Sequence, residues 1–122
     1  MTDAPASTGF LAEDEVSAAL ARELTDAGSA WLLDVREGYE WEAGHAPAAH
    51  HIPLGELGDR QHELPEDQQI LVICRSGARS RMVTDALNEA NYPVANVAGG
   101  MSAWHAEGSP VERDDGTPGA IV

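Results

Sequence analysis

The strongest constraint on the fold is an apolar run that ends in the chain's single cysteine. Residues 70–73 are Ile-Leu-Val-Ile, and Cys74 follows them directly. An uninterrupted apolar run of this length, rich in β-branched residues, is typical of a strand buried on both faces. A short turn containing Gly77 then leads into the segment 80–91, whose apolar residues recur at helical spacing. A buried strand followed at once by a helix indicates an α/β domain.

Strands and helices alternate along the rest of the chain. The pattern predicts strands or short extended segments at 10–11, 30–35, 51–53, 69–73 and 94–98. It predicts helices at 13–27, 37–43, 80–91 and 101–106, the first two ending at Gly28 and Gly44. Because this alternation, with apolar residues on both faces, is typical of parallel sheets, we expect an α/β fold. It would be a single domain with a central, mainly parallel sheet flanked by helices.

The length and composition favour one compact domain. With 122 residues, 43% of them apolar, the chain can bury a core but is short for two domains. We expect the domain to span 9–111, between flexible ends at 1–8 and 112–122 that are small, polar or rich in Gly and Pro. No basic region followed by an apolar run opens the chain, and no apolar stretch is long enough to span a membrane. A single cysteine forms no internal disulfide, so we expect a cytoplasmic protein.

The charge of the chain argues against one class of partner and for another. The chain carries 21 acidic residues against 7 arginines and has no lysine, so its formal net charge is −14. An acidic surface repels nucleic acid and anionic lipid, and we therefore expect neither nucleic acid nor a membrane as a partner. Three of the 7 arginines nevertheless lie within seven positions of Cys74: Arg75, Arg79 and Arg81. This local cluster predicts a pocket for a small anion.

Cys74 itself is expected to be reactive. A lone cysteine often packs as a small apolar residue, but such a residue gains nothing from neighbouring arginines. Cationic side chains and the N-terminus of a helix both lower the pKa of a thiol, and Cys74 has both beside it. In parallel sheets, ligands bind beyond the carboxyl ends of the strands, which is where the sequence places Cys74. The motif and the expected topology both predict a thiolate in a binding site.

Four further observations concern the order of motifs. Residues 32–36 are Leu-Leu-Asp-Val-Arg, and the segment 42–47, Glu-Ala-Gly-His-Ala-Pro, is followed by Ile-Pro-Leu at 52–54. Residues 74–80 are Cys-Arg-Ser-Gly-Ala-Arg-Ser, and residues 97–104 are Val-Ala-Gly-Gly-Met-Ser-Ala-Trp. In this order and spacing, the stretches resemble the motifs of the rhodanese-like sulfurtransferases of the single-domain type. The resemblance covers about residues 10–111 and implies a rhodanese-like domain.

The resemblance implies transfer of sulfane sulfur through Cys74. The cysteine would attack the outer sulfur of thiosulfate or a related persulfide donor, hold it as a persulfide, and pass it to cyanide or to a thiol acceptor, including a protein thiol. No cofactor is needed, because the cysteine itself carries the group. The residues that bind the donor would be the rest of the loop: Arg75, Ser76, Gly77, Ala78, Arg79 and Ser80.

The loop residues suit that role. The backbone N–H groups of residues 75–80 would form a cradle for the added anionic sulfur, and glycine at position 77 would let the backbone curve inward. Arg75 and Arg79 would orient a dianionic donor by charge-assisted hydrogen bonds. Arg81 could equally be a solvated residue in the first turn of the helix. Asp34 and Arg36, which end a predicted strand, are expected to tie neighbouring loops together behind the site.

Other functions use similar parts. Phosphatases and arsenate reductases with a related loop resemble Cys, five residues, then Arg, whereas four residues separate Cys74 from Arg79, and a shorter ring of amides crowds a phosphoryl group. The chain could also be a non-catalytic binding module or a sulfur relay between proteins, which the fold alone does not exclude. We expect no metal site around His45, His50 and His51, because adjacent residues of an extended segment point to opposite sides.

Overall fold

The computed structural model describes residues 10–122, and these residues form a five-stranded sheet in the order β1-β5-β4-β2-β3. Every neighbouring pair of strands is parallel. The strands are β1 (Glu15–Val16), β2 (Ala30–Asp34), β3 (His50–His51), β4 (Gln69–Ile73) and β5 (Val94–Val97). The expected α/β fold with a central parallel sheet is therefore confirmed. The predicted flexible segment 1–8 lies outside the described residues.

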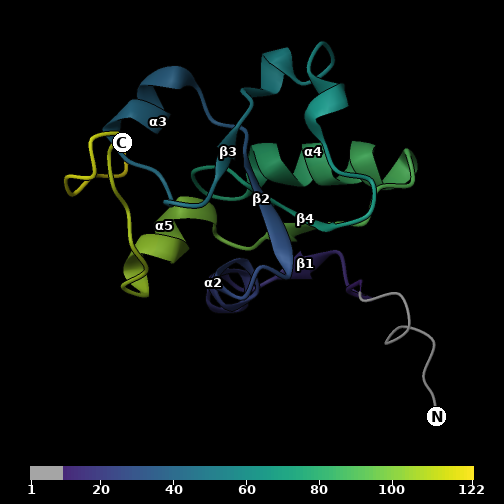
Figure 1. Cartoon of the computed structure of the whole chain (residues 1–122), viewed down its shortest axis with the longest axis horizontal. Coiled ribbons are helices and arrows are strands. Elements are labelled where there is room, and N and C mark those ends of the chain that lie inside the picture. The colour runs from purple at the N-terminus through teal and green to yellow at the C-terminus, as the bar shows by residue number, and fades with distance from the viewer. Residues whose placement is uncertain (1–9) are drawn as a thin grey trace.

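Four α-helices and two short 3-10 helices surround the sheet in the described part of the chain (Figure 1). They are α2 (Ala18–Asp26), α3 (Gly38–Ala43), α4 (Ala78–Glu89), α5 (Gly100–Ala106), η1 (Leu54–Glu56) and η2 (Gln61–Glu63). Helices α2 and α5 cover one face of the sheet, and α4 covers the other (Figure 1). The molecule thus has three layers, with the sheet in the middle.

Strand β4 shows why the apolar run of the sequence becomes the centre of the fold. All five of its residues are buried, because helices cover both of its faces. Leu71 and Ile73 pack into the core layer that contains α2 and α5. Ile70 and Val72 pack into the opposite layer, which contains α4. Burial of such side chains is worth roughly 1.5–3 kcal/mol each, so this strand anchors both layers and fixes the position of the loop that follows it.

The structure corrects the sequence-based prediction near the N-terminus. The expected strand at 10–11 is absent and the expected helix at 13–27 begins later, because β1 occupies Glu15–Val16 and α2 starts at Ala18. The carbonyl groups of Asp14 and Val16 accept hydrogen bonds from the backbone of the β5 region, at 2.8 Å each. Ser17 then caps the helix, since its Oγ accepts a hydrogen bond from the N–H of Leu20 at 3.1 Å. Pairing with β5 therefore delays the helix.

The C-terminal residues, predicted as a flexible tail at 112–122, make backbone contacts with the rest of the domain. Residues 111–120, which we call the C-terminal clasp, lie against the end of α3 (Figure 1). Glu112 exchanges two backbone hydrogen bonds of 2.9 Å with His45, and the N–H of Ala120 donates to the carbonyl of Ala43 at 2.8 Å. Two glycines permit this close approach: a Cβ atom on Gly119 would lie 2.6 Å from the Cα of Gly44. A composition rich in Gly and Pro here serves tight backbone packing.

Candidate functional site

Cys74 lies at the carboxyl end of β4, and its thiol points into the loop that leads to α4. Only 1% of the residue is exposed. The sulfur accepts hydrogen bonds from the N–H of Gly77 at 3.1 Å, from the N–H of Ser80 at 3.4 Å and from the hydroxyl of Ser80 at 3.3 Å. The loop thus surrounds the sulfur with donors, an arrangement that favours a negative charge on it.

The electrostatic consequence is a lowered pKa for the Cys74 thiol. Burial raises this pKa, because a thiolate loses its hydration. The hydrogen bonds from the Ser80 hydroxyl and from the N–H groups of Ser80, Gly77 and Ser76 lower it, and together they outweigh burial. The thiolate is therefore more populated at neutral pH than in a free cysteine, and the thiolate is the nucleophilic form.

Glycines at two points allow the loop to close around the sulfur. Gly77 has a φ of 106°, in the left-handed region, and serves as the N-cap of α4. Gly100, in the first turn of α5, packs so tightly that a side chain there would run into the carbonyl of Cys74. The N–H of Met101 donates to that carbonyl at 2.8 Å, and the N–H of Ser102 donates to the carbonyl of Arg75 at 2.9 Å. The start of α5 therefore clamps the loop.

Arg79 is engaged by a residue that the sequence analysis missed. Its two terminal nitrogens donate to the two carboxylate oxygens of Glu40, at 2.8 and 2.9 Å. Glu40 is only 3% exposed and lies on α3, where its side chain also accepts a hydrogen bond from the N–H of Glu37 at 2.9 Å. The bond from Arg79 lowers the pKa of the Glu40 carboxyl, although burial opposes it. This ion pair, between a buried carboxylate and a half-buried guanidinium, links α3 to the first turn of α4.

The other expected loop residues have different surroundings. Arg75, Ser76 and Ala78 are exposed at the rim of the loop. Within the described residues, no ion pair involves the side chain of Arg75. Arg81 instead points to the surface and pairs with three carboxylates: those of Asp14, Glu15 and Asp85. The cationic cluster of the sequence is therefore spread over three distinct environments.

Asp34 and Arg36 form a fully buried ion pair between the end of β2 and α3. Neither side chain is exposed at all, and the shortest nitrogen–oxygen distance between them is 2.8 Å. The guanidinium of Arg36 also donates to the carbonyl of Gly44 at 2.9 Å and to that of Glu40 at 3.4 Å. The pair thus holds α3, and with it the Glu40 carboxylate, in place beside the loop.

The three histidines of the segment 45–51 stack on tryptophans. His45 and His51 both lie parallel to the ring of Trp41, at centroid distances of 3.6 and 4.7 Å. His50 stacks on Trp31 at 4.3 Å. Across residues 10–122, no group of three His, Cys, Asp or Glu side chains is placed to hold a metal ion. These histidines belong to the packing around α3 and to the C-terminal clasp, where His45 pairs with Asp114 at 2.9 Å.

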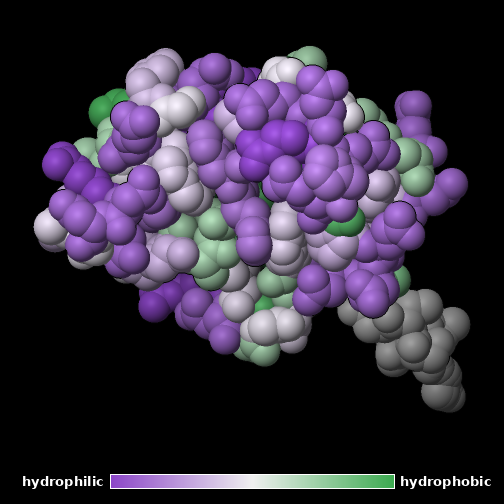
Figure 2. Space-filling view, turned by 45° about the horizontal axis from the view of Figure 1, so that its top comes forward, coloured by the Kyte–Doolittle hydropathy of each residue, from purple (hydrophilic) through white to green (hydrophobic). Residues whose placement is uncertain are grey.

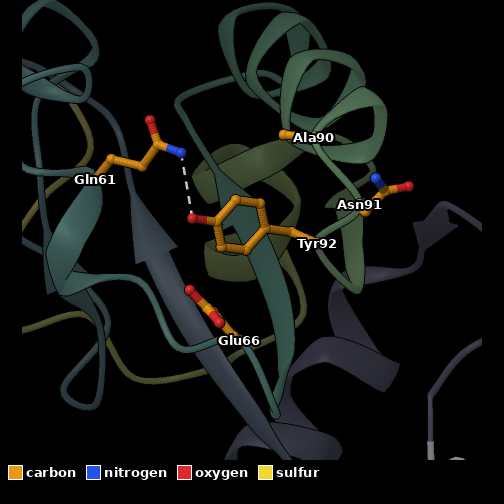
Figure 3. Close-up of a pocket in the computed structure, with 5 residues that line it drawn as sticks. All are labelled: Gln61, Glu66, Ala90, Asn91 and Tyr92. Atoms are coloured by element: carbon orange, nitrogen blue, oxygen red, sulfur yellow. Dashed lines mark hydrogen bonds between the residues drawn. The ribbon is translucent and has the colours of Figure 1, made fainter.

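A separate hollow lies at the opposite end of the sheet from Cys74. It has a volume of about 380 Å³, and Figure 3 shows the five residues that line it. Two of them are joined by a hydrogen bond, which the side-chain amide of Gln61 donates to the hydroxyl of Tyr92 at 3.2 Å. Its remaining lining residues are Glu66, Ala90 and Asn91. Tyr92 and Glu66 precede the starts of β5 and β4, whereas Cys74 follows the end of β4. This hollow is therefore not part of the Cys74 site.

The surface of the domain is predominantly polar. Figure 2 shows hydrophilic residues over most of the face it displays, with apolar residues scattered among them. This is in keeping with the formal net charge of −14. None of the helices described in residues 10–122 is long and apolar enough to cross a membrane.

A parallel α/β domain with one activated thiol in an amide-lined loop defines the class of protein to which this chain belongs. The chain is a member of the rhodanese-like domain family, whose model matches residues 15–107. It is 39% identical over 97 residues to the Bacillus subtilis (strain 168) protein named "Putative sulfurtransferase YtwF", an alignment that covers 79% of this chain and 94% of that protein. The resemblance that the motifs of the sequence indicate is thereby confirmed.

Two further similarities differ in how much of the matched protein they cover. The chain is 39% identical over 109 residues to the HTH-type transcriptional regulator Rv0324 of Mycobacterium tuberculosis. This alignment covers 87% of this chain but 47% of the regulator. The crystal structure of a rhodanese-related protein from Thermoplasma volcanium superimposes with a TM-score of 0.75 at 32% identity, covering 80% of this chain and 96% of that one. The matched region is thus about half of the regulator and nearly the whole of the crystallised Thermoplasma volcanium chain.

Proposed function

We propose that the chain transfers sulfane sulfur from thiosulfate or a small persulfide to a thiol or cyanide acceptor, with Cys74 as the carrier. The observation that carries this proposal is the ring of donors around the Cys74 sulfur, contributed by Gly77 and Ser80. These donors favour a thiolate before the reaction, and we expect them to favour the anionic persulfide after it.

The reaction balances without an external oxidant or reductant. The Cys74 thiolate attacks the outer sulfur of thiosulfate, the sulfur–sulfur bond of the donor breaks, and sulfite leaves with the bonding electron pair. The acceptor thiolate or cyanide then attacks the outer sulfur of the Cys74 persulfide, and the Cys74 thiolate leaves. The enzyme returns to its starting state, as expected for a ping-pong mechanism.

The length of the loop supports sulfur transfer over phosphoryl transfer. Four residues separate Cys74 from Arg79, and the shorter ring of amides suits a single added sulfur atom better than a tetrahedral phosphoryl group.

The mass of the intact protein tests this proposal directly. After brief exposure of the reduced protein to thiosulfate, we expect a species heavier by one sulfur atom, and we expect a thiol acceptor to remove the added mass. A parallel sample is exposed to 2-hydroxyethyl persulfide. If this donor adds a sulfur atom and thiosulfate does not, Cys74 is reactive but prefers persulfides. If neither donor adds a removable sulfur atom, the proposed function is wrong, and a binding role becomes the better account of the domain.

The pH dependence of this loading reports the state of Cys74. The rate should rise with pH as the thiolate forms and should level off above its pKa, at a midpoint below the ordinary thiol value of about 8.5. The Ser80→Ala variant should move the midpoint upward, because it removes the hydrogen bond that does most to lower the pKa of Cys74. Initial loading rates and the ultraviolet absorbance of the thiolate, measured across the same pH range, check both statements. A midpoint that Ser80→Ala leaves unchanged would contradict the assignment.

A further inference from the structure

Carboxylates pair with two of the three arginines around the Cys74 loop. Arg81 is neutralised at the surface by three carboxylates, and Arg79 is neutralised by Glu40. Arg75 remains at the exposed rim, where water and salt screen its charge. The strongly cationic pocket that the sequence predicts is thus reduced, in the folded protein, to one solvated guanidinium beside a thiolate.

Glu40 is placed to act on the loop and not merely to pack beneath it. Its carboxylate is 3% exposed, so solvent screens its charge far less than that of a surface residue. The hydrogen bond from Arg79 to Glu40 is the main cause of the raised pKa of Arg79, and the negative charge of Cys74 adds to it. Arg79 lies in the first turn of α4, directly after the loop, and both of its terminal nitrogens are held by Glu40, so the Glu40 charge reduces the attraction that Arg79 offers to an anion entering the loop.

We propose that Glu40 is a specificity-determining residue, which disfavours dianionic donors such as thiosulfate and favours donors of low charge, such as the persulfide of a small uncharged thiol. This inference rests on the proposed function of Cys74. Thiosulfate brings two negative charges toward a thiolate, while Arg79, the half-buried cation at the start of α4, is already paired with Glu40. A persulfide of an uncharged thiol brings no charge beyond that of its reacting group, and its entry depends little on Arg79.

A purely structural role for Glu40 makes a different prediction. If Glu40 only holds α3 against the loop, its replacement should disturb the site and slow the reaction of every donor alike. If its charge sets selectivity, its replacement should improve the use of thiosulfate alone, through KM. The two roles therefore predict changes of opposite sign for this donor.

The Glu40→Gln variant tests the charge role, because glutamine keeps the size and the acceptor oxygen while removing the charge. We expect the KM for thiosulfate to fall on the order of 5- to 10-fold at low salt, and the KM for 2-hydroxyethyl persulfide to change less than about twofold. The matched control is Glu42→Gln, which makes the same change of charge at an exposed position of α3 and should leave both constants unchanged. The double variant Glu40→Gln/Arg79→Gln restores a neutral pair and should return the ratio of the two constants toward its native value.

Two measurements keep the inference separate from the proposed function. Cys74 is the chain's only cysteine, so an ultraviolet titration of thiolate needs no sulfur transfer, and Glu40→Gln should lower the Cys74 pKa further because Arg79 then acts unopposed. In the native protein, the KM for thiosulfate should not rise with ionic strength, because the net charge of −14 does not attract a dianion and Arg79 is already paired. A native protein that loads from neither donor refutes the proposed function. A native protein that loads refutes the inference if its KM for thiosulfate rises steeply with salt, or if Glu40→Gln leaves its donor ratio unchanged.

Discussion

The Cys74→Ser variant should take up no sulfur from thiosulfate or from a persulfide and should lose transfer activity by at least about a thousandfold. The hydroxyl of serine stays protonated in the pH range where the thiol of Cys74 ionises, so the loop then surrounds a group that is not a nucleophile. Because Cys74 is the only cysteine of the chain, no second thiol can replace it. Steady-state rates and intact mass, measured on the same preparation, give the result.

The fold of this variant provides its control. Serine is slightly smaller than cysteine, and its oxygen can accept the same hydrogen bonds from Gly77 and Ser80. The circular dichroism spectrum and the melting temperature should therefore stay close to those of the native protein. A variant that keeps its fold and also keeps full activity would show that the reaction does not pass through Cys74.

The Arg36→Met variant should lose about 3–5 kcal/mol of unfolding free energy, a large part of the roughly 5–15 kcal/mol that stabilises an ordinary domain. Methionine leaves the fully buried carboxylate of Asp34 without its ionic partner, and it leaves the carbonyl of Gly44 without a donor. Denaturant unfolding, followed by circular dichroism, measures the loss. A decrease below about 1 kcal/mol would contradict the role of this ion pair.

Two comparisons identify the cause of that loss. The Arg22→Met variant removes a surface pair whose side chains are 43% and 63% exposed, and it should cost no more than about 0.5 kcal/mol. The double variant Asp34→Asn/Arg36→Met removes the unpaired charge as well, so it should recover part of the stability lost in the single variant. An equal loss in the single and double variants would assign the effect to packing.

Much of the fold could be predicted from local sequence because its central elements are locally determined. Strand β4 is an unbroken apolar run, and the turn after it holds the glycine that the loop needs. Strand β1 could not be predicted in the same way, because two residues carry no periodicity and owe their conformation to pairing with β5 some eighty residues later. Ser17 was nevertheless a local signal for the start of α2, since serine is a preferred helix cap.

The site was predictable where it is continuous in sequence and unpredictable where it is not. The loop from Cys74 to Ser80 follows from its residue types and spacing. The partnership of Arg79 with Glu40 joins residues 39 positions apart, and no local pattern indicates which carboxylate a given arginine will meet. The glutamates at 37 and 40 do have the spacing of a capping box at the start of α3, but this spacing says nothing of a contact with another helix.

The pairing of the first strand with the last strand has a consequence for the synthesis of the protein. Strand β1 has β5 as its neighbour in the sheet, and the loop around Cys74 is held by the N–H groups of Met101 and Ser102. A nascent chain therefore exposes its only thiol until the segment that carries α5 has left the ribosome. We expect the reactive cysteine to be most vulnerable to oxidation during this interval, before its own fold encloses it.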